Sequence, residues 1–341
     1  MSSNTPRPAS VIIVGAGSVG VLTGYDLSRA GADITFLVRP HRLEQLSRPQ
    51  ALYSYDDHTL QHFSDYDLIT DPAALSQRNA DFVIVTVDGA ALRTEAGLQL
   101  VSEIGRAYRG TDTRVVLATV GIGVRSWFVE QSGIADDQVA MGGTGALIHE
   151  VSAARLPSDP TVDEELLATA DYAFRHPSPA GFRVENNSPK LTDAFTTLLA
   201  GEGVPAAVSI PEGRLGMGAA ALAPILAWGL LGWRSLQEVD PADETWQIGV
   251  NSMRETQRLS AFGETGQAAA AQTDPAGVLE AFRQQEQDSK PLDLAAFNAY
   301  HHGGKVNRQN IEFFEHARRL AAADGAATPS LDAFIERLTT T

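Results

Sequence analysis

Short apolar runs alternate with amphipathic segments along the first half of the chain. Segments with helical spacing follow the first and the third run, at residues 21–31 and 90–108. Continuous apolar runs are typical of strands that are buried on both faces of a parallel sheet, with helices covering those faces. The pattern therefore predicts an α/β fold with a doubly wound parallel sheet at its N-terminal end. The four apolar runs lie at residues 11–14, 33–38, 81–87 and 113–120.

After about residue 185 the apolar positions recur at helical spacing. A chain of 341 residues is long enough for two cores. We therefore predict an α/β domain over residues 1–185 and an all-α domain over residues 186–341. The predicted helical segments of the second domain are 188–203, 214–233, 240–264, a segment around Leu279, 292–300, 309–323 and the residues after Pro329.

One of these predicted helices has two interpretations. The segment 215–233 holds 19 residues without a charge, about the length that crosses a bilayer. Single arginines flank it, it is rich in Ala and Gly, and Pro224 would kink it. These features favour a helix buried in the second domain over a membrane span.

The first apolar run leads directly into GAGSVG, a G-x-G-x-x-G motif. A strand, this motif, a helix and a second strand follow one another as in a Rossmann dinucleotide-binding unit. Gly15 permits the tight turn, Gly17 lets the backbone approach a pyrophosphate, and Gly20 lets the helix pack close to the sheet. The helix N-terminus supplies N–H groups for the phosphates, although a tight turn without a ligand is an alternative. The predicted cofactor-binding residues of the turn are Gly15, Ala16, Gly17, Ser18, Val19 and Gly20.

The end of the second predicted strand indicates which dinucleotide binds. NAD enzymes place an acidic residue there to hold the ribose 2′-hydroxyl. This chain has Val38, Arg39, Pro40 and Arg42, and no acid among them. A guanidinium grips a phosphate through two parallel hydrogen bonds, so Arg39 and Arg42 predict NADP(H) as the cofactor. The alternative is an arginine on a solvated loop.

Two further strand ends are candidates for the cofactor site, because ligands of such sheets bind beyond the carboxyl ends of the strands. Val87 and Asp88 follow the third predicted strand, and Val120 and Gly121 follow the fourth. We expect all four at the cofactor. Asp88 is equally suited to cap the helix that follows it.

The charge and amino-acid composition of the chain exclude several classes of binding partner and site. A formal net charge of −16 argues against nucleic acid, because a phosphate backbone would repel the protein. The absence of cysteine excludes disulfides, thiolate metal sites and a cysteine nucleophile. The first ten residues, MSSNTPRPAS, lack the apolar core of a signal peptide. We therefore expect a cytoplasmic protein that acts on a small molecule, without a membrane or nucleic-acid partner.

Five stretches along nearly the whole chain match the pattern of one enzyme family: VIIVGAGSVG, FLVRP, VIVTVDGAAL, MRETQRLSAFG and GAATPSLDAFIERL. Through these stretches the chain resembles the ketopantoate reductase family of NADP-dependent oxidoreductases. The resemblance implies a Rossmann domain joined to a helical domain that contacts the substrate and forms a homodimer. Small residues in the segment 215–233 would allow close packing of helices.

The chain departs from the family where the family's chemistry resides. The family has a catalytic lysine, followed by asparagines at four-residue spacing, where this chain has Leu215, Ala219 and Ala223. Asp88 replaces another lysine, and Val120 replaces the asparagine of an Asn-Gly turn. Without these donors the charge of a keto acid would stay unpaired, at a cost of several kcal/mol. Ketopantoate is therefore not the expected substrate.

Part of the family's pattern is retained at Asp293, where the family has glutamate, and at Asn298, which matches an asparagine. Just beyond them the chain reads HHGGK. His301 or His302 could act as a general acid, and Lys305 could replace the lost lysine. The predicted catalytic residues are therefore His301, Lys305, Asp293 and Asn298.

Other interpretations of HHGGK remain open. In the first, the segment is a helix C-cap in which Gly303 is left-handed and Lys305 is solvated. In another, Lys305 and Asn307 hold an anionic group of the cofactor or the substrate. Metal binding ranks last, because adjacent histidines rarely bind one ion, and we expect no metal. His149 with Glu150 is a weaker candidate site.

The predicted function is that of an NADPH-dependent oxidoreductase that reduces a ketone or imine of a small molecule other than ketopantoate. Two alternatives share the fold. The protein could be a non-catalytic NADP-binding sensor, or it could be an NADP-dependent dehydrogenase of an alcohol or amine.

Overall fold

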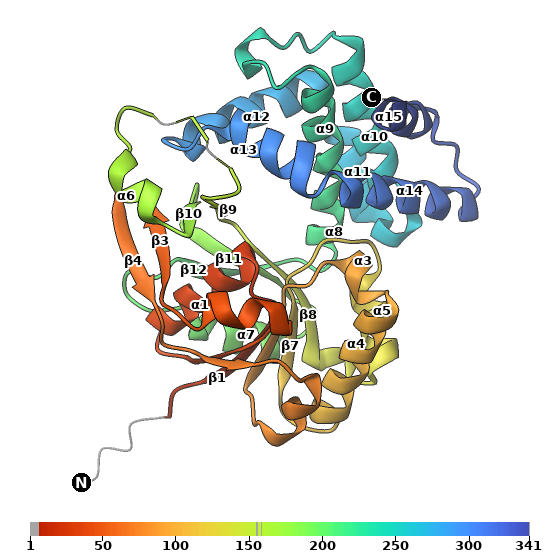
Figure 1. Ribbon diagram of the computed structural model, residues 1–341. Helices are drawn as coiled ribbons and strands as arrows, with labels where there is room; N and C mark the ends of the chain where they lie inside the picture. The colour runs from red at the N-terminus through yellow and green to blue at the C-terminus, as the bar shows by residue number, and fades with distance from the viewer. Residues whose placement is uncertain (1–6, 155, 158, 341) are drawn as a thin grey trace. The chain divides into compact units, whose positions relative to one another are not determined.

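The computed structural model describes residues 7–154, 156–157 and 159–340, so part of the N-terminal stretch MSSNTPRPAS lies outside the described residues. The chain divides into two compact units (Figure 1). The first unit holds the chain up to Val120, then Val124–Val151 and Glu165–Glu212. The second unit holds Gly121–Gly123, the described residues of Ser152–Glu164, and the chain from Gly213 onward.

A large sheet forms the centre of the first unit. In the described part of the chain it has eight strands in the order β12-β11-β8-β7-β6-β1-β2-β5. Neighbouring strands are parallel except for β8 and β11, which are antiparallel. The strands are β1 (Ser10–Val14), β2 (Asp33–Leu37), β5 (Asp67–Ile69), β6 (Phe82–Val85), β7 (Arg114–Leu117), β8 (Val139–Thr144), β11 (Ala180–Glu185) and β12 (Ala206–Ile210).

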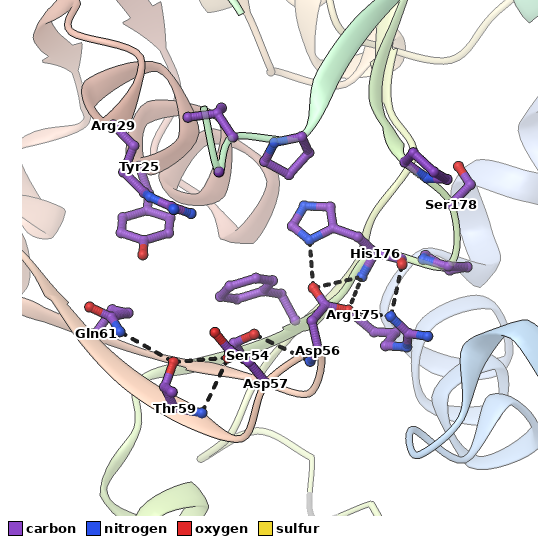
Figure 2. Close-up of a pocket in the computed structure, with 16 residues that line it drawn as sticks. Tyr25, Arg29, Ser54, Asp56, Asp57, Thr59, Gln61, Arg175, His176 and Ser178 are labelled. Carbon is purple, nitrogen blue, oxygen red and sulfur yellow. Dashed lines mark hydrogen bonds and ion pairs between the residues drawn. The ribbon is translucent and has the colours of Figure 1, made fainter. Parts of the chain in front are cut away.

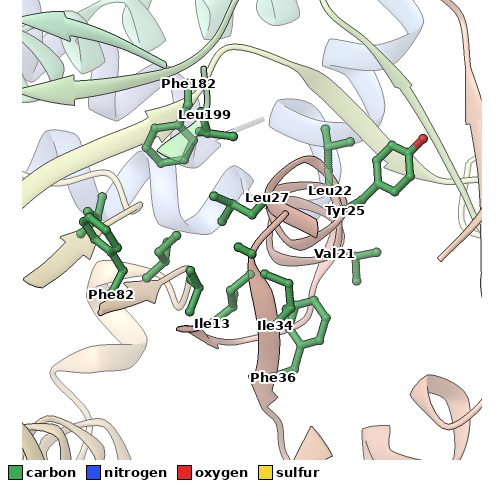
Figure 3. Packing of buried hydrophobic residues seen from close by; sticks show 14 of the residues in the cluster. Ile13, Val21, Leu22, Tyr25, Leu27, Ile34, Phe36, Phe82, Phe182 and Leu199 are labelled. Atoms are coloured by element: carbon green, nitrogen blue, oxygen red, sulfur yellow. The ribbon is translucent and has the colours of Figure 1, made fainter. Parts of the chain in front are cut away.

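Helices cover both faces of this sheet. Figure 1 shows α4 and α5 together on one side and α1 and α7 on the other. Val21 and Leu22 of α1 belong to the same buried cluster as Ile13 and Phe36 of the strands below (Figure 3). The predicted doubly wound α/β architecture is confirmed. The bounds are α1 (Ser18–Arg29), α3 (Gly89–Leu92), α4 (Glu95–Tyr108), α5 (Val124–Ser132) and α7 (Pro189–Leu198), with the short η1 (Pro40–Arg42), α2 (Leu43–Leu46), η2 (Pro72–Gln77), η3 (Asp136–Gln138) and α6 (Glu164–Thr169) between them.

A second, smaller sheet was not predicted from the sequence. Its strands follow the order β4-β3-β10-β9 among the described residues. Strands β3 and β4 form a hairpin, whereas β10 comes from more than 100 residues later in the chain. Leu52, Phe63 and Tyr172 of this sheet join the buried cluster around α1. The strands are β3 (Gln50–Ser54), β4 (Thr59–Phe63), β9 (Leu147–Glu150) and β10 (Tyr172–Arg175).

The predicted helix 90–108 is interrupted after Leu92. The hydroxyl of Thr94 accepts a hydrogen bond from the N–H of Gly97 at 3.2 Å, and this cap starts α4 as a separate helix.

The units divide after Glu212, later than the predicted boundary at residue 185. Helix α7 and strand β12 belong to the first unit, because β12 pairs in parallel with β11 from Ala206 to Ile210. Strand β12 lies in a stretch for which the sequence predicted helices alone.

In the described part of the chain after Gly213 all the regular secondary structure is helical, as predicted for the second domain. The expected long helix 214–233 is three shorter pieces, α8, η4 and α9. No helix among the described residues combines the length and apolar character needed to cross a membrane. The helical elements of the second unit are α8 (Arg214–Gly218), η4 (Ala219–Ala221), α9 (Leu222–Leu230), η5 (Leu236–Glu238), α10 (Glu244–Gln257), η6 (Ser260–Phe262), α11 (Gly263–Gln272), α12 (Pro275–Ser289), α13 (Leu294–Tyr300), η7 (His301–Lys305), α14 (Asn307–Ala323) and α15 (Pro329–Thr340).

Candidate functional site

Gly15 opens the glycine turn where β1 ends. It has a φ of +104°, a backbone conformation that favours glycine. Its N–H donates to the Leu37 carbonyl oxygen at 3.0 Å, which ties the turn to the end of β2. The Thr86 hydroxyl lies 2.9 Å from the Gly15 carbonyl oxygen, so it can donate to that oxygen. A Cβ on Gly15 would lie 2.8 Å from the same hydroxyl, so conformation and space both require glycine here.

Gly20 and Gly17 differ in the space that a side chain would have. A Cβ on Gly20 would lie 2.1 Å from the Gly15 carbonyl oxygen, so the close packing of α1 on the turn requires glycine at this position. A Cβ on Gly17 would have no atom within 4 Å among the described residues. The open space at Gly17 is therefore on the side from which a ligand can approach the backbone.

The turn fits the pyrophosphate of a dinucleotide. Gly17 is the N-cap of α1 and has no side chain with which to cap it. The helix therefore directs backbone N–H groups and the positive end of its dipole toward the open space. Ala16 and Ser18 are buried and Val19 is half-buried, so the turn presents mainly its backbone.

Arg42 crosses from the end of β2 to this turn. Its Nη2 donates to the Ala16 carbonyl oxygen at 3.1 Å and to the Tyr172 hydroxyl at 3.2 Å. Its Nε is buried and has no hydrogen-bond partner among the described residues. Arg39 is exposed at the start of η1. The structure therefore brings Arg42 to the glycine turn, where the ribose of a bound dinucleotide is expected.

Asp88 caps a helix, as the alternative interpretation proposed. Its Oδ1 accepts a hydrogen bond from the Ala91 N–H at 2.8 Å at the start of α3. Val87 lies next to Gly15, since a Cβ built on Gly15 would be 3.4 Å from a Val87 methyl group. Val120 is 59% exposed beyond β7, whereas Gly121 belongs to the second unit.

The second unit holds the predicted catalytic residues on one continuous segment, α13 and η7. Asp293 is the N-cap of α13, and its Oδ1 accepts from the Ala296 N–H at 2.9 Å. His301 lies at the other end of the helix, about 12 Å along the axis at 1.5 Å per residue. Asn298 is 6% exposed. The segment therefore does not bring Asp293 and His301 to one reacting atom.

The HHGGK segment is a π-helical turn, so the alternative interpretation as a helix C-cap is wrong. The N–H of Val306 donates to the His301 carbonyl oxygen at 2.8 Å, five residues back. Gly303 does not have the left-handed backbone that this alternative requires, because the helical backbone continues through it. A Cβ on Gly303 would lie 3.3 Å from the Trp233 ring, so glycine provides close packing instead. Such single-turn π-helices often lie at functional sites.

Both histidines of this turn are neutral near pH 7. Burial, and then the positive charge of Lys305, lower the pKa of His301 to about 4. Burial and the charge of His301 lower the pKa of His302 to about 3. Asn310 Nδ2 donates to His302 Nδ1 at 3.2 Å, so the neutral ring of His302 carries its proton on Nε2. Each ring can therefore donate a hydrogen bond, but neither is the protonated acid that the sequence predicted.

Sequence reasoning missed three residues beside the candidate sites. Thr86 directly follows β6, and this position could have indicated it. Tyr172 contacts Arg42 across 130 residues of sequence, and Asn310 contacts His302 across a turn of unpredicted geometry. Neither of these two contacts has a local sequence signal.

The predicted weaker candidate at His149 is a buried structural position. His149 is 1% exposed in β9, and its Nε2 lies 3.2 Å from the Tyr55 hydroxyl. Its neighbour Glu150 is half-buried.

A separate cavity of about 600 Å³ lies in the first unit beside the last turns of α1 (Figure 2). His176 lines it, with Nδ1 2.8 Å from Asp56 Oδ2 and Nε2 3.7 Å from Asp26 Oδ2. Burial acts to lower the pKa of His176, but hydrogen bonds and charges of the two aspartates outweigh burial and raise it to about 9. The wall at Arg29 is about 18 Å along α1 from Gly17, so this cavity is not the dinucleotide cradle.

Residues 11–124 match the family model described as ketopantoate reductase PanE/ApbA. This range contains the glycine turn, Arg42 and the strand ends after β6 and β7. No curated protein sequence is significantly similar to the chain.

Solved structures share the fold over 97% of the chain. A probable 2-dehydropantoate 2-reductase from Bacillus subtilis is 13% identical, is covered over 99% of its own length and has a TM-score of 0.64. D-mandelate dehydrogenase with NADH and anilino(oxo)acetate is 13% identical, is covered over 97% and has a TM-score of 0.65. A dimeric ketopantoate reductase from Staphylococcus aureus is 15% identical, is covered over its full length (100%) and has a TM-score of 0.56. Residues 11–124 are thus similar to the ketopantoate reductase PanE/ApbA family model, and over 97% of its length the chain shares its fold with solved 2-dehydropantoate 2-reductases.

Proposed function

We propose that this protein is an NADPH-dependent oxidoreductase that reduces a ketone or imine of a small molecule other than ketopantoate. The observation that carries the proposal is the glycine turn of the first unit. Gly17 leaves open space at an uncapped helix N-terminus, and Gly20 holds that helix against the turn. These features support dinucleotide binding. NADPH, when bound, would supply the hydride, and Lys305 would supply the proton that the reduced oxygen or nitrogen takes up.

The preference for NADPH over NADH is supported by Arg39 and Arg42. No acidic residue follows β2 to hold a ribose 2′-hydroxyl, and the Arg42 guanidinium lies at the glycine turn. A 2′-phosphate carries the negative charge that a guanidinium binds through paired hydrogen bonds. D-mandelate dehydrogenase shares the fold and was solved with NADH. Because the fold alone does not indicate which dinucleotide binds, the preference for NADPH is argued from Arg39 and Arg42 of this chain.

For the substrate, we propose that His301 and Lys305 contact the reacting group. A neutral His301 donates a hydrogen bond to a carbonyl oxygen without first carrying a positive charge, and this suits charge that develops during reduction. Lys305 lies four residues from His301 on the same π-helical turn, and its positive charge contributes to the lowered pKa of His301. Asn298 remains a candidate for orienting the substrate. Asp293 is assigned to the helix cap and not to the reaction.

The substrate class follows from three side chains on α8, η4 and α9. Leu215, Ala219 and Ala223 carry no hydrogen-bond donor. The resemblance to ketopantoate reductases places these three residues at the positions where that family has the lysine and asparagines that bind its keto acid. A substrate with less negative charge than ketopantoate would lose less from this change.

We also propose a homodimer through the helical unit. The support is the small-residue composition of α8 and η4, together with the dimer named for the Staphylococcus aureus relative. Light scattering of the purified protein tests this assembly, and a monomeric mass would contradict it.

Two measurements on the purified protein test the function. Fluorescence titration compares the Kd of NADPH with that of NADH, and loss of NADPH absorbance reports turnover with a panel of ketones, 2-oxo acids and imines. We expect tighter binding of NADPH and turnover with at least one panel member. Tight NADPH binding without turnover would favour the sensor. If the protein oxidises alcohols or amines with NADP⁺ but reduces no panel member with NADPH, the result would favour the alternative function of an alcohol or amine dehydrogenase.

A further inference from the structure

Two groups from distant parts of the first unit fix the Arg42 guanidinium. Its Nη2 donates to the Ala16 carbonyl oxygen in the glycine turn and to the Tyr172 hydroxyl on β10. A guanidinium nitrogen of this type carries two N–H groups, so both are used. Because the guanidinium is planar, two acceptors on one nitrogen set the direction of the remaining N–H groups.

Tyr172 is suited to this task by its rigidity. Its side chain is fully buried, at 0% exposed, and β10 is paired with β3 on one side and β9 on the other. Burial raises the pKa of Tyr172, so its hydroxyl stays a neutral group that accepts from Arg42. The phenol therefore offers a fixed acceptor to a flexible arginine side chain.

The other two guanidinium nitrogens of Arg42 form no hydrogen bond with the described residues. Nε is buried without a hydrogen-bond partner, and Nη1 has no hydrogen-bond partner among the described residues. Nη1 therefore keeps two N–H groups for an anion beside the glycine turn. An arginine that is held in place loses less side-chain entropy when it binds a phosphate.

We propose that Tyr172 is a positioning residue that holds Arg42 for the 2′-phosphate of NADP(H) and thereby sets the preference for NADP(H) over NAD(H). The inference rests on the dinucleotide binding proposed above. Tyr172 acts through Arg42 and does not itself touch the cofactor. Its effect is therefore confined to the cofactor that carries the 2′-phosphate.

Calorimetric titration with NADP⁺ and with NAD⁺ tests the inference on the full chain. The variants are Tyr172→Phe, Arg42→Ala and the double substitution. Tyr55→Phe is the matched control, because it also removes a buried tyrosine hydroxyl, one that pairs with His149 and not with Arg42. Thermal unfolding of each variant reports whether it is folded.

We expect Tyr172→Phe to raise the Kd of NADP⁺ by roughly three- to tenfold and to leave the Kd of NAD⁺ within about twofold. In the Arg42→Ala background the same change should have no further effect, because the two residues act as one unit. The control should match the wild type for both nucleotides. Should Tyr172→Phe not fold, Tyr172→Met replaces it, since methionine fills part of the same space and also lacks the hydroxyl; the same selective loss is expected.

Three outcomes would overturn the inference. Unchanged NADP⁺ affinity in Tyr172→Phe, an equal loss for both nucleotides, or additive losses in the double variant would each show that Tyr172 does not act through Arg42. A wild-type protein that binds neither nucleotide, or prefers NAD⁺, would instead refute the cofactor proposal itself, and the inference would fall with it. The wild-type titration alone separates these cases.

Discussion

His176 Nδ1 lies 2.8 Å from Asp56 Oδ2, and this ion pair joins the turn after β3 to the segment after β10 (Figure 2). The His176 side chain is 10% exposed, so water screens the pair weakly. Burial tends to raise the pKa of Asp56, but hydrogen bonds from His176 and Arg175 hold it below its usual value. At neutral pH the pair is therefore a charged connection between two parts of the smaller sheet.

This pair predicts a loss of stability in alkaline solution. The pKa of His176 rises from 6.5 to about 9 in the folded protein, so its contribution is fully present below pH 6.5 and is lost as pH rises through about 9. The full shift corresponds to about 3 kcal/mol. Urea unfolding at several pH values should show this fall in the wild type and a smaller one in His176→Gln. Parallel curves for the two proteins would contradict the assignment.

Two glycines of the turn should respond differently to alanine. Gly20→Ala should lower the free energy of unfolding by about 1–3 kcal/mol, because its Cβ would lie 2.1 Å from a carbonyl oxygen. Gly17→Ala should leave stability nearly unchanged, because no atom in the described part of the chain would lie within 4 Å of its Cβ, but it should weaken NADPH binding roughly tenfold or more. Thermal unfolding and NADPH titration of both variants check this. Equal effects of the two changes on stability would count against the geometry of the turn.

Asp293 should tolerate asparagine but not alanine. Asparagine caps a helix about as well as aspartate, whereas alanine removes the bond to Ala296 and should cost about 1 kcal/mol. Turnover should be the same in Asp293→Asn and in the wild type. If Asp293→Asn folds normally but loses turnover, the carboxylate takes part in the reaction, as the sequence first predicted.

Substitution of His301 or Lys305 should lower kcat without changing the Kd of NADPH. We expect a loss of roughly tenfold to a hundredfold for His301→Ala, because one hydrogen-bond donor to the developing charge is removed. His62→Ala, at an exposed position of β4, is the control. Steady-state kinetics on a substrate found in the panel provide the measurement. Unchanged kcat in both variants would remove these residues from the proposed site.

The pH dependence of kcat gives a further test of His301. Because its pKa is about 4, its ring stays neutral over the usual assay range. A plot of kcat against pH should therefore show no change caused by titration of His301 between about pH 5.5 and about pH 8. A step near pH 6.5 that disappears in His301→Asn would show instead that this histidine exchanges a proton during turnover.

The parts of the fold that depend on neighbouring residues were predictable from the sequence. Buried strands gave continuous apolar runs, and the roles of Gly15 and Gly20 follow from a motif whose strand and helix are adjacent in the chain. The smaller sheet was not predictable, because β3 and β10 are short and lie far apart in sequence. Strand β12 was missed for a different reason: it is short and lies between two segments with helical spacing.

The candidate sites divide in a similar way. Arg42 was predicted from its position after β2, but its partner Tyr172 lies 130 residues away. The π-helical turn was missed because Gly303 also suits a C-cap, and only the nearby Trp233 ring explains why glycine is needed there. The neutral state of His301 depends on burial, which the sequence pattern of this turn does not report.

The most direct test of the central claim follows a hydride from cofactor to product. The protein is incubated with NADPH deuterated at the reactive carbon of its nicotinamide and with the panel of ketones, 2-oxo acids and imines. Mass spectrometry then reads the products. We expect a product that carries one deuterium, formed faster with deuterated NADPH than with deuterated NADH. Binding of NADPH with no deuterium transferred to any panel member would contradict it.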